Sequence, residues 1–131
     1  PAAQIPAHMA PMGIHFYNGN AFPDQYRGAA FVSLRGGSEA GVPGYKVIAI
    51  FDLREGGDTR RADFLTGFQR VPRIGSENGV WGKPVGVISD VEGSLYVTSD
   101  WYTHLVLKIT YERSATAILE ERTPNCRPTS N

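Results

Sequence analysis

An internal repeat constrains the fold of this chain more than any other feature. The stretch "WGKPVGVISDVEGSLYVTSDW", residues 81–101, reads as a strand, a tight turn and a second strand, and residues 8–34 echo it more loosely. The matched pieces are "PMG" at 11–13 with "PVG" at 84–86, "GAAFVSL" from Gly28 with "GSLYVTS" from Gly93, and "GYKVIAIFD" from Gly44 with "HLVLKITYE" from His104. Each copy is therefore predicted to be an antiparallel unit of three short strands, and "RADFLTGF" adds a fourth strand to the first copy.

Strand signals dominate the rest of the chain. Runs rich in β-branched and aromatic residues, separated by clusters of Gly, Pro, Asn and Asp, predict seven strands. These strands are expected at 13–17, 29–34, 45–53, 62–68, 85–89, 94–99 and 104–111. Residues 114–122 fit a last strand or a short helix equally well, and the final residues read as a flexible tail.

The fold class predicted from these strands is all-β. Units of three or four strands at this period are typical of β-propeller blades, which favours a β-propeller portion of about two antiparallel blades. A seven-stranded β-sandwich is the alternative. The propeller interpretation divides the chain into an irregular lead-in (1–10), a blade (11–70), a last incomplete blade (71–113) and a closing segment with a flexible tail (114–131). Because two blades leave exposed edges, the remaining blades are expected as partners, in the same precursor or in another chain.

Composition narrows the classes of partner. The 131 residues include 13 Lys and Arg and 13 Asp and Glu, so the net charge of zero argues against nucleic acid and anionic membranes. No apolar run approaches the roughly 18 residues of a membrane span. The chain opens on "PAAQIPAH" and not on Met, which predicts a processed or excised piece. The lone Cys126 can form neither an internal disulfide nor a metal site, so it is an incidental thiol or a bridge to another chain.

Two cations are the candidate binding residues. The sequence carries no nucleophile motif such as G-x-S-x-G or H-E-x-x-H. Arg35 follows the second strand of the first unit, and Lys83 directly precedes the first strand of the second unit. Such positions can direct both cations at one central anion, which must be paired and hydrogen-bonded if it is buried. The alternative is two solvated surface cations.

Histidines and acidic residues give weaker signals. His8 stands at the head of the first strand, as Trp81 does in the second copy, so it is a candidate for contacting a substrate or transferring a proton. A structural histidine is the alternative there, and His15 and His104 are predicted within strands as structural residues. Turn positions predict caps for backbone amides at Asp24, Asp90, Glu92 and Asp100, and calcium ligands are the alternative, although the spacing is not that of an EF-hand.

Several of these motifs resemble, in order over about residues 6–111, the C-terminal part of the glucose/sorbosone dehydrogenase family. Members of that family are six-bladed β-propellers that use pyrroloquinoline quinone. The resemblance implies an oxidoreductase, a quinoprotein sugar dehydrogenase that oxidises a sugar or alcohol outside the cell or in the periplasm. It implies that Lys83 pairs with a carboxylate of the quinone, where the family has Arg, and that Arg35 also meets the cofactor. The general-base histidine and the Ca²⁺ ligands of the family lie in earlier blades, so the resemblance places no catalytic residue and no metal ligand in this chain, with His8 as the remaining candidate.

Departures from the family pattern leave a second interpretation open. Lys83 replaces Arg, Glu92 replaces Asp, Val85 stands where some members carry another Arg, and the loop at 35–41 differs. Since Lys lacks the planar fork of Arg, contact with the quinone is expected to be weaker or altered. The alternative function is a non-catalytic β-propeller module that binds carbohydrate or protein.

Overall fold

The computed structural model describes residues 1–37, 44–53, 59–69, 79–101 and 103–112. These residues form two antiparallel sheets and a single short 3-10 helix, with no α-helix among them. The predicted all-β class with two antiparallel units is therefore confirmed. The predictions for residues 114–131, including Cys126, lie outside the described residues.

The first sheet contains four strands in chain order: β1 (Pro11–Phe16), β2 (Ala30–Leu34), β3 (Lys46–Phe51) and β4 (Arg60–Leu65). The 3-10 helix η1 (Asp24–Tyr26) lies between β1 and β2. The second sheet contains β5 (Pro84–Ser89), β6 (Leu95–Ser99) and β7 (Val106–Ile109), also in chain order. All pairs of neighbouring strands are antiparallel.

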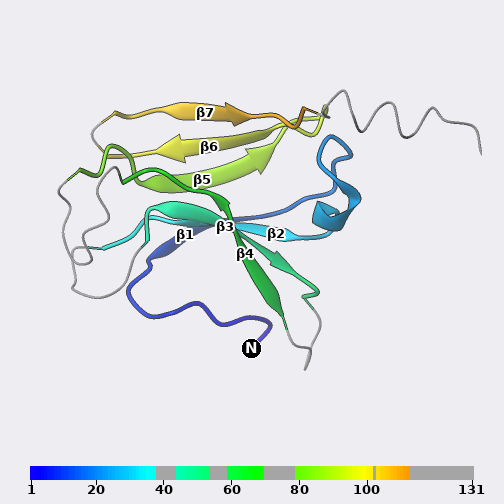
Figure 1. Ribbon diagram of the computed structural model, residues 1–131, viewed down its shortest axis with the longest axis horizontal. Coiled ribbons are helices and arrows are strands. Elements are labelled where there is room, and N and C mark those ends of the chain that lie inside the picture. Colours follow the sequence, from blue (N-terminus) through cyan, green and yellow to red (C-terminus); the bar gives the residue numbers. More distant parts are fainter. Residues whose placement is uncertain (38–43, 54–58, 70–78, 102, 113–131) are drawn as a thin grey trace, which may run out of the picture.

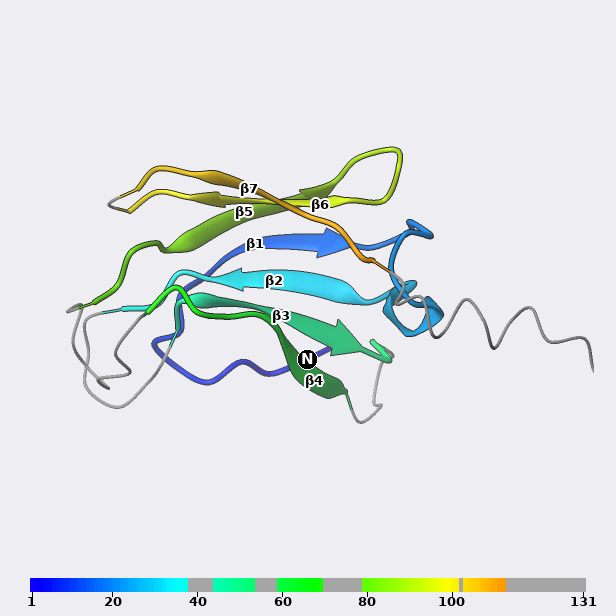
Figure 2. The same ribbon diagram turned by 45° about the horizontal axis from the view of Figure 1, so that its top comes forward.

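The two sheets meet along β1 and β5. Contacts between the sheets concentrate on β1 with β5 and on β2 with β5, and the remaining strands of each sheet lead away from this line (Figures 1 and 2). The two sheets do not close a ring. A closed propeller is therefore not what these residues form by themselves.

The repeat seen in the sequence is also present in the backbone. β1 and β5 both begin at a proline and both have an irregular register near that proline. Gly28 and Gly93, which precede the second strand of each unit, have φ values of 79° and 89°, a conformation that favours glycine. The two units are thus built on one plan from strand to turn to strand.

The main hydrophobic core lies on the face of the first sheet that is turned toward the second sheet. Aromatic residues fill it, and the ring of Tyr17 packs edge-on against Phe22 and Phe31. The Tyr17 hydroxyl donates to the Gly93 carbonyl oxygen at 2.8 Å and accepts from the Phe22 amide at 3.2 Å. The buried hydroxyl of Tyr17 is therefore hydrogen-bonded both as a donor and as an acceptor. Its bond to Gly93 connects the first unit to the turn of the second.

Candidate functional site

Arg35 and Asp100 occupy equivalent positions of the two units, one residue beyond β2 and β6. The Arg35 amide donates to the Ala10 carbonyl at 3.0 Å, and the Asp100 amide donates to the Lys83 carbonyl at 3.3 Å. Ala10 and Lys83 are also equivalent, because each directly precedes the first strand of its unit. The repeat therefore brings the ends of β2 and β6 side by side with matching backbone geometry.

An ion pair joins the two equivalent side chains. Arg35 Nε lies 3.2 Å from Asp100 Oδ1 and 3.0 Å from Oδ2. The side chains are 29% and 47% exposed, so this pair contributes at most about 1 kcal/mol to stability. Among the described residues, Nη1 and Nη2 of Arg35 have no hydrogen bond or ion pair. The carboxylate thus uses one nitrogen of the guanidinium and leaves the two terminal nitrogens as donors for another acceptor.

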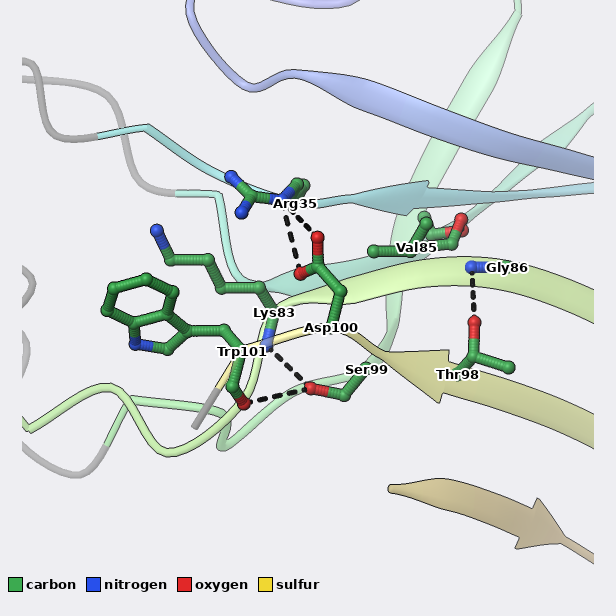
Figure 3. Close-up of polar contacts among 9 residues, drawn as sticks. Arg35, Lys83, Val85, Gly86, Thr98, Ser99, Asp100 and Trp101 are labelled. Atoms are coloured by element: carbon green, nitrogen blue, oxygen red, sulfur yellow. Dashed lines mark hydrogen bonds and ion pairs between the residues drawn. The ribbon is translucent and has the colours of Figure 1, made fainter. Parts of the chain in front are cut away.

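Lys83 lies beside this pair beneath two aromatic rings. The residue is only 2% exposed, and its Nζ lies 4.4 Å from the ring centre of Trp101 and 5.8 Å from that of Tyr45. Its amide donates to Ser99 Oγ at 3.0 Å, which holds the start of β5 against the end of β6. Figure 3 shows the ends of the Arg35 and Lys83 side chains pointing to the same side, away from the strands. The rings stabilise the ammonium by cation–π attraction while it is withdrawn from water.

Unusual backbone conformations gather around these side chains. His8, Ala10 and Tyr45 have φ values of 64°, 49° and 57°, in the left-handed region that residues with a Cβ rarely adopt. The Tyr45 hydroxyl donates to the Gly37 carbonyl at 3.0 Å, and the Gly36 amide donates to the Met9 carbonyl at 3.0 Å. Each left-handed residue of this kind costs on the order of 1–3 kcal/mol, and such strain clusters at functional sites. The segment before β1, the start of β3 and the end of β2 therefore meet in one strained junction.

The structure places Arg35 and Lys83 near each other and surrounds them with residues to which the sequence analysis had given no part in a binding site. Asp100 was predicted to cap a turn but pairs with Arg35. Tyr45 and Trp101 were not singled out for their contacts with Lys83. For Asp100 a signal existed, since the repeat aligns it with Arg35, whereas no sequence spacing indicates the two rings.

The Arg35–Asp100 ion pair does not include the other residues considered in the sequence analysis. His8 has a left-handed backbone and sits in the segment before β1. Val85 offers its carbonyl to Ser33 Oγ at 2.7 Å, between the sheets. His15 lies within β1, and its Nε2 is 2.8 Å from Ser89 Oγ. His104 was predicted within a strand, but it precedes β7 and has a φ of 45°.

The acidic turn residues have local partners. Asp90 Oδ1 accepts from the Glu92 amide at 3.0 Å and from the Ser94 amide at 2.9 Å, as a turn cap does. Desolvation raises the pKa of Asp90, but these hydrogen bonds, together with Tyr96 and Lys108, outweigh it and leave the pKa below its usual value. Asp24 pairs with Arg27 at 3.4 Å.

Neither a metal centre nor a membrane-spanning helix is found among the described residues. No group of three His, Cys, Asp or Glu side chains in the described ranges is placed to hold a metal ion. No helix in the same part of the chain has the length and apolarity needed to span a membrane.

Comparison with known proteins gives one relative. A protein of Borreliella burgdorferi named "Uncharacterized protein" is 34% identical over 113 residues, which are 84% of this chain and 28% of that protein. The chain therefore spans little more than a quarter of the length of the relative that it matches. No solved structure matches the chain.

The family match corrects the resemblance that was drawn from the motifs. Residues 1–110 match the TrAA12-like family, and not the glucose/sorbosone dehydrogenases. The assignment as a pyrroloquinoline quinone-dependent sugar dehydrogenase was therefore wrong, and so were the oxidoreductase and quinoprotein assignments that depended on it. The match gives no support to the alternative of a carbohydrate- or protein-binding propeller module either. The short motifs shared with the dehydrogenases come mainly from strands and turns, which many β proteins need. The chain belongs to the TrAA12-like family.

Proposed function

We propose that Arg35 and Lys83 form a binding site for a small anion that carries carboxylate or phosphate groups. One observation carries the proposal. Asp100 engages Arg35 only through Nε, and the two remaining guanidinium nitrogens extend to the same side as the Lys83 ammonium. A planar fork with two free donors matches the two oxygens of a carboxylate or phosphate.

The two cations have different parts in this proposal. Arg35 is partly exposed and would donate two hydrogen bonds to the anion. Lys83 is covered by Trp101 and Tyr45 and would not bond the anion directly. Its charge would attract the anion over a longer distance, through surroundings that screen the charge less than water does. Asp100 holds the guanidinium in place, so Arg35 loses less conformational entropy when the anion binds.

The cofactors and partners expected from the sequence remain predictions. Pyrroloquinoline quinone belongs to the chemical class that such a site accepts, and Ca²⁺ would need ligands from outside this chain. The remaining β-sheets of a larger protein also stay a proposal, which the greater length of the Borreliella burgdorferi relative supports.

Isothermal titration calorimetry with citrate, inorganic phosphate and pyrroloquinoline quinone tests the anion site. We expect Arg35→Ala to weaken binding of the best of these anions at least tenfold, because it removes both free donors. Lys83→Met keeps the aliphatic stem and removes the charge, and it should weaken binding about three- to tenfold.

Arg27→Ala is the matched control, since Arg27 also pairs with an aspartate but lies beyond the other end of β2. Its affinity should equal that of the unmodified protein, with folding of each variant checked by circular dichroism. Equal loss of affinity in Arg27→Ala and Arg35→Ala, or no loss in Arg35→Ala, would exclude the site.

A further inference from the structure

The turn that follows β1 carries the dipeptide Asn18-Gly19, at the opposite end of the first sheet from Arg35. Asn18 is exposed and Gly19 is half-buried. Among the described residues, neither the side chain of Asn18 nor the main-chain amide of Gly19 has a hydrogen bond. The carboxamide of Asn18 and the amide that follows it in the chain are therefore both unpaired.

The residue after an asparagine decides how stable its side chain is. Asparagine is one of the thermolabile residues of proteins, because the main-chain nitrogen of the next residue can attack its carboxamide. The attack is fastest before glycine, since a Cβ would crowd this nitrogen and restrict the backbone around it. A hydrogen bond from the same amide would also hold the nitrogen in place. Gly19 has no Cβ, and its amide has no such bond to any described residue.

We propose that Asn18 is a site of spontaneous deamidation. The Gly19 nitrogen forms a bond to Cγ of Asn18, and the bond from Cγ to the side-chain nitrogen breaks. That nitrogen leaves as ammonia and takes the proton of the Gly19 amide, so a succinimide ring remains. Water then opens the ring at one of its two carbonyl carbons. The products are aspartate, or isoaspartate with the main chain running through the former side chain, and no oxidant or reductant is consumed.

The isoaspartate product does not fit the turn. It lengthens the main chain by one carbon and adds a negative charge. The turn has no room for an added carbon, because a Cβ on Gly19 would lie 2.6 Å from Tyr17 Oη and 2.9 Å from Gly93 Cα. Tyr17 and Gly93 share the hydrogen bond of 2.8 Å that connects the first unit to the second. Deamidation should therefore loosen the contact between the two sheets.

Asn20 is a matched control within the same turn. It is also exposed, but the next residue is Ala21, whose Cβ hinders the attack. The tryptic peptide that ends at Arg27 contains both asparagines, so one mass-spectrometric measurement compares them. We expect deamidation of the folded protein at pH 8 and 37 °C to be at least tenfold faster at Asn18 than at Asn20. Protein L-isoaspartate methyltransferase should methylate the product at position 18.

Two results of this measurement would overturn the proposal. Equal rates at Asn18 and Asn20 would show that the glycine has no effect. An Asn18 that stays intact in the folded protein but deamidates in guanidinium chloride would show that the fold prevents the attack.

A second measurement tests the structural consequence. The sequence contains one further Asn-Gly dipeptide, with Asn78 outside the described residues, so the comparison is made in an Asn78→Ser background. Asn18→Ser cannot form the succinimide. We expect the urea midpoint of the background protein to fall during incubation at pH 8, whereas that of the Asn18→Ser variant stays constant. An equal fall in both proteins would contradict the predicted loosening of the contact.

Discussion

At the level of single residues, partial burial between the sheets lowers the pKa of a histidine. His15 lies in β1 with its Nε2 2.8 Å from Ser89 Oγ of β5. Desolvation lowers the pKa of His15 below its usual value. The folded state therefore binds protons at this site less readily than the unfolded chain does.

Acidification should consequently destabilise the fold through His15. The contribution of the neutral imidazole is complete above a pH of about 6.5, and it is lost as the pH falls through the lower pKa of the folded state. We expect the melting temperature to fall by a few degrees more between pH 7.5 and pH 5 in the unmodified protein than in His15→Gln. Thermal melts followed by circular dichroism at both pH values measure this difference, and identical pH dependence in the two proteins would contradict the assignment.

The sequence could predict that Arg35 and Lys83 lie next to the ends of strands, but not what surrounds them. Arg35 and Lys83 were found because strand ends can be located from alternation and turn glycines. Their contacts with Asp100, Tyr45 and Trp101 depend on which edges of the sheets meet, which is a tertiary property. Only the alignment of Arg35 with Asp100 was present in the repeat itself.

At the level of strands, glycine sets how closely β1 approaches β5. A Cβ added to Gly13 would lie 2.5 Å from the Val85 carbonyl oxygen and 3.0 Å from Ser33 Oγ. The first of these atoms belongs to the backbone of β5, so it cannot move away without shifting the strand. The Pro-x-Gly motif, which occurs in both copies of the internal repeat, thus has a role in packing that the repeat alone does not explain.

Gly13→Ala should therefore destabilise the fold by about 1–3 kcal/mol, the usual cost of overpacking a tight contact. Urea unfolding measures the loss. Met12→Ala is the control, because the side chain of Met12 is on the opposite face and is exposed, so its cost should be well below 1 kcal/mol. A free energy of unfolding that is equal in the two variants would contradict the close approach.

Strand positions were predictable to within a few residues, and the differences have local causes. The prediction started the first strand at residue 13, whereas β1 begins at Pro11, since proline is tolerated at the first residue of an edge strand. The last predicted strand, 104–111, was too long. β7 covers only Val106–Ile109, and His104 before it adopts a left-handed backbone that strands disfavour.

At the level of the whole molecule, two side-chain hydrogen bonds join the sheets, and we expect the two sheets to unfold together. Tyr17 of the first unit bonds to the Gly93 carbonyl of the second, and Ser33 Oγ donates to the Val85 carbonyl. These contacts join residues more than fifty positions apart in sequence. The pattern of strands could not reveal them, because either fold considered for the chain allows many ways of placing one sheet on the other.

Tyr17→Phe tests this coupling. The change leaves the Gly93 carbonyl and the Phe22 amide without their partner, which costs about 1–3 kcal/mol. We expect a lower urea midpoint with a single transition. Both tryptophans, Trp81 and Trp101, belong to the second unit, so their fluorescence reports on that unit while circular dichroism reports on both. Separate midpoints for the two signals in the unmodified protein would show that the sheets unfold independently.

The pairing of Arg35 with Asp100 has a consequence for how such units choose their neighbours. The two residues occupy the same position of the repeat, so a unit stacked on an identical copy of itself would bring two guanidinium groups, or two carboxylates, face to face. Like charges at that distance repel, so the pairing of two identical units is destabilised, whereas the pairing of Arg35 with Asp100 is stabilised. A chain of similar units can therefore favour one order of packing through the sign of one side chain in each unit.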